Sequence, residues 1–506
     1  MSKLMADQEQ LEGLISLCEA TLGDLPKDVK RPRYDRSRLT PGIVHIGLGN
    51  FHRAHQAWYL HRLMQDGKAL DWAIIGAGVR PADAAQRGRL KKQDWLTTLI
   101  ELDPAHSSAE VVGSMIDYVP VEAGNGPLIG AMADPAIRIV SLTVTESGYF
   151  VDPATGGFDG GHPDIQHDAA NPSRPRTAFG AMIEALRRRR DAGAPAFTCQ
   201  SCDNLQGNGA VLRRTVVSLA RLSDPALADW IEAECGFPNS MVDCIAPATG
   251  PTELSLAQSF GVDDAAPVTH EAFRQWVIED DFRAGRPPWE EVGATISDRV
   301  HDFETMKIRI LNAGHQVLAN AGEVFGVETI AGCMAHPQIA AMFAKVQREE
   351  IVATVSPVPG MAPLDYVDLI TTRFANPRIV DTTRRVAFDG SARHPGFLHP
   401  IIRDQLAAAR PIDGLALVEA IWARMCEGVR EDGSTIDAND PIWADLVDAA
   451  TRSREEPAIW LDQRRLYGDL GESEPFARAF SHWRRMISKD GLAAAIAAYA
   501  DEGAAI

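Results

Sequence analysis

Residues 42–53 read GIVHIGLGNFHR: a short apolar run ends in a Gly-x-Gly turn and leads into a helical pattern over Arg53–Met64. In a dinucleotide-binding turn, the first glycine (here Gly47) permits the tight turn, and the second (Gly49) lets the backbone approach a pyrophosphate. The N-terminus of the following helix then offers free N–H groups. The third glycine of Gly-x-Gly-x-x-Gly is missing because His52 stands there, and glycine turns between strand and helix also occur for structural reasons. The stretch therefore predicts a strand–turn–helix unit and favours a dinucleotide cofactor.

The segments around this stretch repeat the order of strand and then helix. A second apolar run, Trp72–Ile75, ends in a Gly-Ala-Gly turn, and a third, Ile137–Val144, is mostly β-branched, as expected of a strand covered on both faces. Helical patterns lie at Leu128–Ala133 and Ala178–Arg190. Strands and helices in alternation indicate right-handed βαβ units, so we expect an α/β, Rossmann-type domain with a parallel sheet.

The second half of the chain has a different pattern. From about Glu304 the apolar residues recur at helical spacing, and strand-like runs are few. The helical segments are Met306–Leu318, Ile339–Gln347, Pro363–Phe374, Ile401–Ala408, Leu415–Met425, Pro475–Ile487 and Gly491–Ala500. Chains beyond roughly 250–300 residues usually split into domains. We therefore divide the 506 residues into a Rossmann-type dinucleotide-binding domain over 1–297 and a mainly α-helical substrate and catalytic domain over 298–506.

Composition limits the partners of the protein. The net charge is -19, which repels nucleic acid phosphates and anionic lipid, and no apolar run approaches the roughly 20 residues of a membrane span. The N-terminus lacks the apolar stretch of a secretory signal, and the seven cysteines are odd in number and scattered. We expect a cytoplasmic protein that binds a small molecule and neither nucleic acid nor membrane.

A Cys-x-x-Cys pair, Cys199 and Cys202, raises the question of a metal or redox site. The pair follows the apolar run 196–198, which is typical of a buried strand, and no second cysteine or histidine pair follows at zinc spacing. We interpret both cysteines as buried structural thiols rather than as a redox or metal site, and we expect no metal.

Two charged residues near the second glycine turn bear on the choice of cofactor. Asp83 lies five residues beyond Gly78, where a carboxylate can bind the adenosine ribose of NAD. Arg80 is also close and would instead meet the 2′-phosphate of NADP. We favour Asp83 and NAD, although both side chains also suit a solvated loop. Thr145, just past the third strand, either faces the cofactor or is a buried hydroxyl at a strand end.

Two further polar clusters are candidates for chemistry. Residues 202–209 (CDNLQGNG) follow a buried strand and form either part of a ligand crevice or a turn with a helix N-cap near Asn208. In the run KIRILNAGH, a helix would let Lys307, Asn312 and His315 converge on one side. A desolvated lysine can act as a general base, whereas an exposed lysine and a hydrogen-bonded core histidine are the ordinary alternative.

Six segments together resemble the mannitol 2-dehydrogenase family, the polyol-specific long-chain dehydrogenase/reductases. They are VHIGLGNFHRAHQAWYL (44–60), SLTVTESGYF (141–150), SCDNLQGNG (201–209), KIRILNAGH (307–315), SPVPG (356–360) and RVAFDGS (385–391). The resemblance runs in order from about residue 40 to at least residue 400. It implies a Rossmann-type N-terminal domain and a largely helical C-terminal domain.

The resemblance assigns catalytic roles to five residues. The family's catalytic lysine, the general base, falls on Lys307. Its oxyanion-holding asparagines fall on Asn204 and Asn312, and its substrate-orienting histidine falls on His315. The acid that connects the lysine to solvent falls on Glu304.

The resemblance also assigns binding roles. The two cations that bind sugar hydroxyls fall on Arg385 and, with a change from lysine, on Arg393, and the acid that selects NAD falls on Asp83. The residues expected to bind the cofactor are Gly47, Leu48, Gly49, Asn50, Phe51, Asp83 and Thr145.

Three positions depart from the family pattern. Cys244 replaces the arginine of Val-Asp-Arg-Ile, Asn50 replaces the second glycine of Gly-Gly-Phe, and Arg393 replaces a lysine. An arginine presents a planar fork where a lysine presents a point charge, so the last change bears on substrate choice.

The sequence thus predicts an NAD-dependent polyol dehydrogenase that converts D-mannitol to D-fructose. The alternatives are a dehydrogenase of D-arabinitol or D-sorbitol, a hexuronate reductase of the fructuronate type, and a non-catalytic dinucleotide sensor. The sequence leaves the oligomeric state open.

Overall fold

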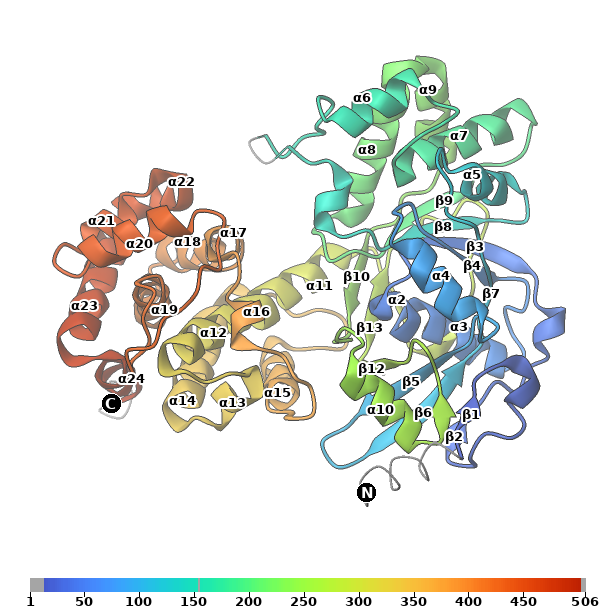
Figure 1. Ribbon diagram of the computed structural model, residues 1–506. Coiled ribbons are helices and arrows are strands. Elements are labelled where there is room, and N and C mark those ends of the chain that lie inside the picture. Colours follow the sequence, from blue (N-terminus) through green and yellow to red (C-terminus); the bar gives the residue numbers. More distant parts are fainter. Residues whose placement is uncertain (1–12, 153–154, 502–506) are drawn as a thin grey trace. The chain divides into compact units, whose positions relative to one another are not determined.

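The computed structural model describes residues 13–152 and 155–501, and the chain divides into two compact units, Met1–His301 and Asp302–Ile506 (Figure 1). The first unit contains a parallel β-sheet that is covered by helices. The described part of the second unit is helical and has only isolated β-bridges. The expected fold class, a Rossmann-type region followed by a mainly helical one, is therefore confirmed. None of the described helices is both long enough and apolar enough to span a bilayer.

The centre of the first unit is a five-stranded sheet with the order β7-β4-β3-β8-β9, in which every neighbouring pair is parallel. Its strands are β3 (Pro41–Ile46), β4 (Ala73–Ala77), β7 (Met115–Tyr118), β8 (Ile139–Leu142) and β9 (Thr198–Ser201). The chain starts at the central strand, builds outward to one side, and then crosses to the other side. In such sheets ligands bind beyond the carboxyl ends of the strands where the order reverses, here at β3 and β8.

Helices cover both faces of this sheet because successive side chains of a strand point to opposite faces. Val44 and Ile46 of β3 pack with one set of helices, α5 (Gly126–Ala133), α7 (Ala178–Asp191), α8 (Asn208–Ser223) and α9 (Pro225–Glu234). Ile43 packs on the other face, against α3 (Gln56–Gln65). Burying each such side chain stabilises the fold by roughly 1.5–3 kcal/mol, which explains the apolar character of β3.

The first unit also contains three smaller sheets that the sequence patterns did not reveal. They have the orders β12-β5-β6-β2, β10-β13-β14 and β1-β11. Their strands are β1 (Ile15–Ser16), β2 (Val29–Lys30), β5 (Thr97–Leu102), β6 (Ser107–Val112), β10 (Ser240–Asp243), β11 (Val262–Asp263), β12 (Val268–His270), β13 (Gln275–Ile278) and β14 (Thr295–Ile296). Two of the pairs, β5–β6 and β10–β13, are antiparallel, so the unit is not purely parallel.

The expected helix over Arg53–Met64 is wrong in one respect, because it is divided. Helix α2 (Asn50–Ala54) ends before His55, whose backbone is not helical, and α3 begins at Gln56. Two further helices of this unit are α4 (Asp83–Lys91) and α6 (Pro163–Ala170), and α10 (Pro251–Ser259) follows later.

The second unit is built around the buried helix α19 (Asp413–Met425), which packs against α12 (Ala313–Phe325), α23 (Glu474–Asp490) and α24 (Leu492–Asp501). Its other helices are α11 (Val300–Met306, which begins just before the unit boundary), α13 (Ile330–Ala335), α14 (Pro337–Lys345), α15 (Pro363–Phe374), α16 (Thr383–Val386), α17 (Gly390–Arg393), α18 (His399–Ala407), α20 (Trp443–Arg452), α21 (Ala458–Leu461) and α22 (Arg464–Tyr467). Figure 1 shows α19 surrounded by the other orange and red helices.

Three π turns interrupt these helices: η5 (Lys307–Asn312), η6 (Val346–Ile351) and η8 (His394–Leu398). The expectation of one regular helix over Met306–Leu318 is therefore wrong across the first π turn, and the helix expected over Ile339–Gln347 changes to a π turn at its end. Apolar periodicity locates a helix but does not distinguish i→i+4 from i→i+5 hydrogen bonds, because both leave one face buried.

Candidate functional site

The glycine turn after β3 has the backbone geometry of a cofactor turn. Gly47 has a φ of +96°, and its N–H donates to Ala77 O at 3.0 Å. A Cβ at Gly47 would lie 2.0 Å from the carbonyl oxygen of Thr143, so only glycine fits there. Gly49 is different: a Cβ added to it would meet no atom within 4 Å. The first glycine is therefore required by the fold, and the second leaves open space beside the backbone.

A cavity of about 470 Å³ lies over this turn. Its walls include Gly47, Leu48 and Gly49 together with Val79, Arg80, Asp83, Tyr118, Thr143, Thr145, Phe150 and Thr177. The carboxyl ends of β3, β4 and β8 all open onto it, as a dinucleotide site in this topology requires. A turn with one sterically obligatory glycine and one open glycine fits the approach of a pyrophosphate.

Two residues of the expected cofactor turn do not line this cavity. The Asn50 amide donates to Pro247 O at 2.6 Å and to Thr249 Oγ1 at 2.9 Å, and its Oδ1 accepts from Arg53. The Phe51 ring stacks on His55, with ring centroids 4.9 Å apart. Both side chains therefore contact residues that lie outside the cavity lining.

His52, which stands in place of the third glycine, lies flat against His45 of β3. The ring centroids are 3.4 Å apart and the interplanar angle is 12°. Burial lowers the pKa of His45 to about 3 and holds the pKa of His52 well below its usual value, so both rings are neutral at neutral pH. The third glycine of the motif serves close packing between helix and strand. Here two stacked neutral rings make that contact instead.

Asp83 and Arg80 both line the cavity, so the lining alone does not distinguish a site for NAD from a site for NADP. A carboxylate oxygen of Asp83 accepts the backbone N–H of Arg80 at 2.9 Å, which holds the carboxylate at the start of α4. A Cβ at Gly78 would lie 2.3 Å from the Cβ of Asp83. The expected Gly-Ala-Gly turn is therefore wrong in part, because Gly76 and Ala77 belong to β4, and Gly78 directly after the strand makes room for the acid.

Asp203, expected from the sequence only as part of a polar cluster, accepts three hydrogen bonds from the loop after β8. One carboxylate oxygen accepts from Thr145 N at 2.8 Å, and the other accepts from Val144 N at 3.0 Å and from the Tyr149 hydroxyl at 2.6 Å. Burial raises the pKa of Asp203, and these donors lower it. Thr145 itself has a φ of +71°, a strained conformation that this pairing helps to hold. In the sequence, the position of this acid just after a buried strand was the feature that could have indicated its role.

The neighbour of Asp203, Asn204, is exposed at the carboxyl end of β9. The Asn208 side chain is buried and bridges Asp203 O and Ser240 O, at 3.1 and 2.7 Å. Within the run CDNLQGNG, the structure thus separates two buried supporting residues, Asp203 and Asn208, from one exposed amide.

In the second unit, Glu304, Lys307, Asn312 and His315 lie along α11, the first π turn and the start of α12. Glu304 and Lys307 are buried, although their side chains are charged. Lys307 opens the π turn and Asn312 closes it. Charged side chains are rarely buried unless they are paired or functional, so this segment is the strongest candidate for chemistry in the unit.

His315 is a partly buried, neutral imidazole. Its ring stacks on Phe374 with centroids 4.2 Å apart, and burial lowers its pKa to about 4. Its Nε2 is buried without a hydrogen-bond partner among the described residues, 3.9 Å from a carboxylate oxygen of Asp381. A buried, unsatisfied ring nitrogen on a rigid stack is able to hold a hydroxyl group.

The two arginines expected to bind substrate differ in their pairing. Arg385 donates through Nε and Nη2 to both oxygens of Asp381, at 2.7 and 2.6 Å. Arg393 donates through Nη1 to the backbone carbonyls of Arg385 and Val386, at 3.5 and 2.5 Å. The carboxylate of Asp381 thus lies between Arg385 and His315, and the charge of Arg385 is already matched.

The cysteines and metal-binding residue types form no alternative site in the described chain. Cys199 and Cys202 are buried, and burial raises the pKa of both thiols. Within residues 13–152 and 155–501, no three His, Cys, Asp or Glu side chains are grouped so that they could hold a metal ion. Cys244, the departure from the family pattern, is buried near Arg274; burial lowers the pKa of that guanidinium, and Cys244 partly offsets the effect.

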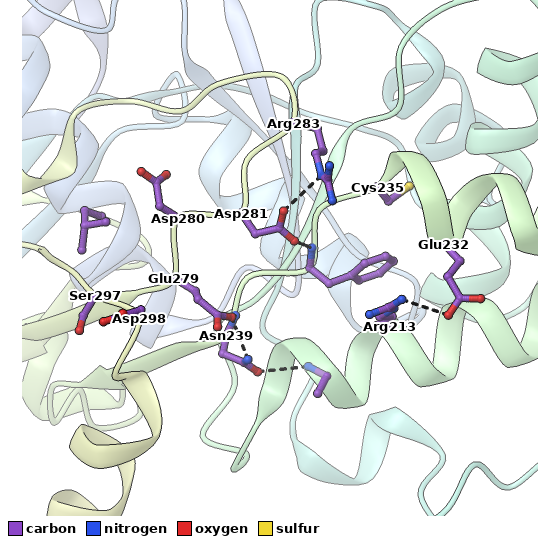
Figure 2. A pocket seen from close by; sticks show the side chains of 13 residues that line it. Arg213, Glu232, Cys235, Asn239, Glu279, Asp280, Asp281, Arg283, Ser297 and Asp298 are labelled. Carbon is purple, nitrogen blue, oxygen red and sulfur yellow. Dashed lines mark hydrogen bonds and ion pairs between the residues drawn. The ribbon is translucent and has the colours of Figure 1, made fainter.

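Figure 2 shows a second cavity of the first unit, of about 820 Å³, away from the glycine turn. Two ion pairs lie within its lining, Arg213 with Glu232 at 3.0 Å and Arg283 with Asp281 at 3.2 Å. Asn239 accepts from a backbone N–H of α8 and donates to Glu279. Most of the polar side chains in this lining are therefore engaged in contacts with one another.

Comparison with known proteins agrees with the geometry. The family model described as the mannitol dehydrogenase Rossmann domain matches residues 41–291, and the mannitol dehydrogenase C-terminal domain matches residues 299–487. A mannitol 2-dehydrogenase of Cereibacter sphaeroides is 54% identical over 93% of this chain and 99% of its own length. One from Aspergillus terreus is 40% identical over 94% of this chain and 96% of its own.

Two solved structures are similar over nearly the whole chain. A Pseudomonas fluorescens mannitol 2-dehydrogenase, in a ternary complex with NAD and D-mannitol, matches with a TM-score of 0.84 and 38% identity, covering 96% of this chain and 99% of that one. A substrate-free D-sorbitol dehydrogenase matches with a TM-score of 0.89 and 35% identity, covering 95% and 100%.

Proposed function

Because this chain belongs to the mannitol dehydrogenase family, as its resemblance indicated, we propose that it is an NAD-dependent polyol dehydrogenase that oxidises D-mannitol to D-fructose. The observation that carries the proposal is the 54% identity to a mannitol 2-dehydrogenase over almost the full length of both chains. The first unit would hold the cofactor, and the second would supply the base and the substrate contacts. The seven cysteines are odd in number and scattered along the chain, which supports work in a reducing compartment, so we propose a cytoplasmic location.

The residues around the glycine turn would hold NAD, which accepts the hydride of the substrate when bound. Gly47 shapes the turn, and the open side of Gly49 accommodates a pyrophosphate. The Asp83 carboxylate would bind the ribose hydroxyls and repel a 2′-phosphate, which favours NAD over NADP. Thr145 would contact the cofactor from the loop held by Asp203.

Lys307 would remove the proton of the hydroxyl group as the carbon–hydrogen bond breaks. Its buried position at the start of the π turn supports this role, since a lysine held within reach of the hydroxyl group can act as a general base. The amides of Asn204 and Asn312 would donate to the oxygen as its negative charge develops. His315, neutral above a pH of about 4, would orient the hydroxyl, and Glu304 would pass the proton toward solvent.

The pairing of Arg385 supports a neutral substrate. A uronate needs an unmatched cation for its carboxylate, yet Arg385 is bound bidentately by Asp381, whose negative charge would repel an acid. A polyol needs only hydroxyl partners, which Arg385, Arg393 and His315 together offer. We therefore expect a lower kcat/KM for a hexuronate than for mannitol. D-Sorbitol stays the second candidate, because the D-sorbitol dehydrogenase is similar over the whole chain.

The test is a panel of mannitol, sorbitol, arabinitol and mannonate, each with NAD and NADP, followed by nicotinamide absorbance. We expect mannitol with NAD to have the highest kcat/KM. Lys307→Ala should lower kcat by roughly 10²–10⁴-fold with NADH binding unchanged, because general-base catalysis contributes about that much. Lys489→Ala, an exposed lysine of the same unit, is the matched control. Wild-type turnover by the Lys307 variant would refute the assignment of the base, and a preference for mannonate would move the substrate to the uronates.

A further inference from the structure

The spacing of Lys307 and Asn312 does not suit a regular helix. In an α-helix, residues five apart point about 140° away from each other around the axis, and residue 311 would be the one that shares a side with Lys307. In the structure, Ala313 N–H donates to Ile308 O, an i→i+5 bond, as well as to Ile310 O. A π turn inserts one residue into the helical turn, so residues five apart approach the same side. The π turn therefore brings the lysine and the asparagine together.

A buried glutamine from a second π turn holds the middle of the first one. Gln347 lies in η6, is fully buried, and donates through Nε2 to Ile310 O at 2.8 Å. Ile310 lies between Lys307 and Asn312, and its carbonyl is thereby tied both to Ala313 of its own helix and to Gln347 of the neighbouring turn. The two π turns pack against each other at this point.

Gly314 makes room for this contact. A Cβ at Gly314 would lie 2.4 Å from Gln347 Nε2 and 3.1 Å from a ring carbon of Phe343. The backbone at Gly314 is ordinary α-helix, where glycine costs about 1 kcal/mol relative to alanine. The glycine between Asn312 and His315 is therefore explained by the space that the Gln347 amide occupies.

The contact is not an efficient way to stabilise the fold. The other polar atom of the side chain, Gln347 Oε1, is buried without a hydrogen-bond partner among the described residues. A buried unpaired acceptor costs about 1–3 kcal/mol, comparable to or greater than the net gain from one hydrogen bond. A methionine of similar shape would avoid that cost while losing the hydrogen bond, so Gln347→Met should change the free energy of unfolding little.

We propose that Gln347 is a positioning residue for catalysis: through Ile310 O, in the space left by Gly314, it holds the π turn that sets Lys307 and Asn312 toward the same substrate oxygen. The inference rests on the proposed role of Lys307 as the base. Gln347 acts on the reaction only through the helix that carries the two groups.

The test compares Gln347→Met with Gln405→Met in the full-length enzyme. Gln405 is also fully buried, donates through Nε2 to a carbonyl (Pro411 O, 3.2 Å) and leaves its Oε1 unpaired, but it lies on α18 outside the π turns. We expect Gln347→Met to lower kcat by roughly 10–100-fold, because small misplacement of reacting groups has effects of that size. The KM for NAD and the thermal midpoint should stay close to wild type, and the pH midpoint of kcat should differ from that of wild type. Gln405→Met should leave kcat and its pH midpoint unchanged.

A second variant keeps the test decisive if the methionine protein does not fold. Gly314→Ala retains Gln347 but pushes its amide off Ile310 O, and should also lower kcat at unchanged KM for NAD. If Lys307→Ala is inactive while Gln347→Met or Gly314→Ala keeps wild-type kcat and pH midpoint, the positioning role is wrong and the proposed function stands. If Lys307→Ala itself keeps wild-type turnover, the proposed function fails, and this inference fails with it.

Discussion

The glycine turn of the first unit and the π turn of the second are both unusual backbone segments at a proposed site, but they are held in different ways. The glycine turn is set by steric contact, since Gly47 touches the backbone of Thr143 and no side chain fits between them. The π turn is set by a side chain, Gln347, that reaches in from a neighbouring element. The cavity proposed for the cofactor thus depends on main-chain shape, whereas the groups proposed to react depend on packing between helices.

This difference leads to distinct expectations for substitution. Where the backbone itself forms the site, adding one methyl group should damage folding and binding together. Where a neighbour holds the site, a well-chosen substitution should change the reaction and leave folding intact. Four further experiments use this contrast.

Gly47→Ala should have the largest effect, because it combines a left-handed φ with a Cβ placed 2.0 Å from Thr143 O. The backbone strain alone costs about 1–3 kcal/mol, and relieving the overlap moves β3 against β8. We expect loss of NADH binding and a strongly lowered thermal midpoint. Gly49→Ala should bind NADH more weakly at an unchanged midpoint, since its Cβ enters open space. Gly88→Ala on the exposed face of α4 is the control, and equal behaviour of Gly47→Ala and Gly88→Ala would refute the steric account.

Asp203 and Asn204 are adjacent residues with opposite expected effects. Asp203→Ala leaves Val144 N, Thr145 N and the Tyr149 hydroxyl without their acceptor, and should lower the free energy of unfolding by about 3 kcal/mol. Asn204→Ala, at an exposed position, should change it by less than about 0.5 kcal/mol while lowering kcat. Chemical denaturation and steady-state kinetics on both variants test this contrast. A stable Asp203→Ala protein would show that the loop after β8 does not need the carboxylate.

Asp83→Ala probes a proposed cofactor contact of the first unit that depends on a side chain rather than on the backbone. Removing the carboxylate takes away its repulsion of a 2′-phosphate and leaves Arg80 in the same cavity. The ratio of kcat/KM for NADP to that for NAD should rise roughly tenfold, about 1.4 kcal/mol of surface electrostatics. Gln86→Ala, another residue lining the cavity, is the control. A wild-type enzyme that already prefers NADP would contradict the assignment and point to Arg80.

The sequence predicted the first unit better than the second for a physical reason. A buried parallel strand such as β3 is read directly from its apolar run, and Gly47 marks the turn because no other residue adopts its conformation. The short strands of the smaller sheets, such as β13 and β14, carry too few residues for a period to show. They are also paired with strands far away in sequence, as β12 is with β5.

In the second unit, the positions of the helices follow from their apolar spacing, but the π turns do not. The run KIRILNAGH was interpreted as one helix on which three polar groups converge, yet an α-helix would have turned Asn312 away from Lys307. The inserted residue depends on Gln347, more than thirty positions later, and only the glycine between Asn312 and His315 hints at it. The roles of the individual site residues stay predictions that the variants above are designed to test.

The smallest expected effect concerns Glu350, which lies in the same π turn as Gln347. Its carboxylate accepts from Gly414 N and Leu415 N at the start of α19, at 2.6 and 2.9 Å, and from the Tyr499 hydroxyl at 3.2 Å. Burial, with a smaller contribution from Asp413, raises the pKa of Glu350 to about 7 from the usual 4.5. Between those values the folded protein keeps a proton that the unfolded chain has lost. The stabilisation is therefore complete below a pH of about 4.5 and is lost as the pH rises through 7.

Glu350→Gln tests whether this neighbouring contact supports the fold rather than the reaction. The wild-type protein should lose about 1 kcal/mol of unfolding free energy between pH 6 and pH 8 through this group, and Glu350→Gln should remove that part of the pH dependence while kcat stays unchanged. Glu349→Gln, at an exposed position one residue earlier, should keep the wild-type dependence. If both variants followed the wild-type pH dependence, Glu350 would not titrate in this range. If Glu350→Gln instead lowered kcat as strongly as Gln347→Met, the whole second π turn, and not the one amide, would be what positions the lysine.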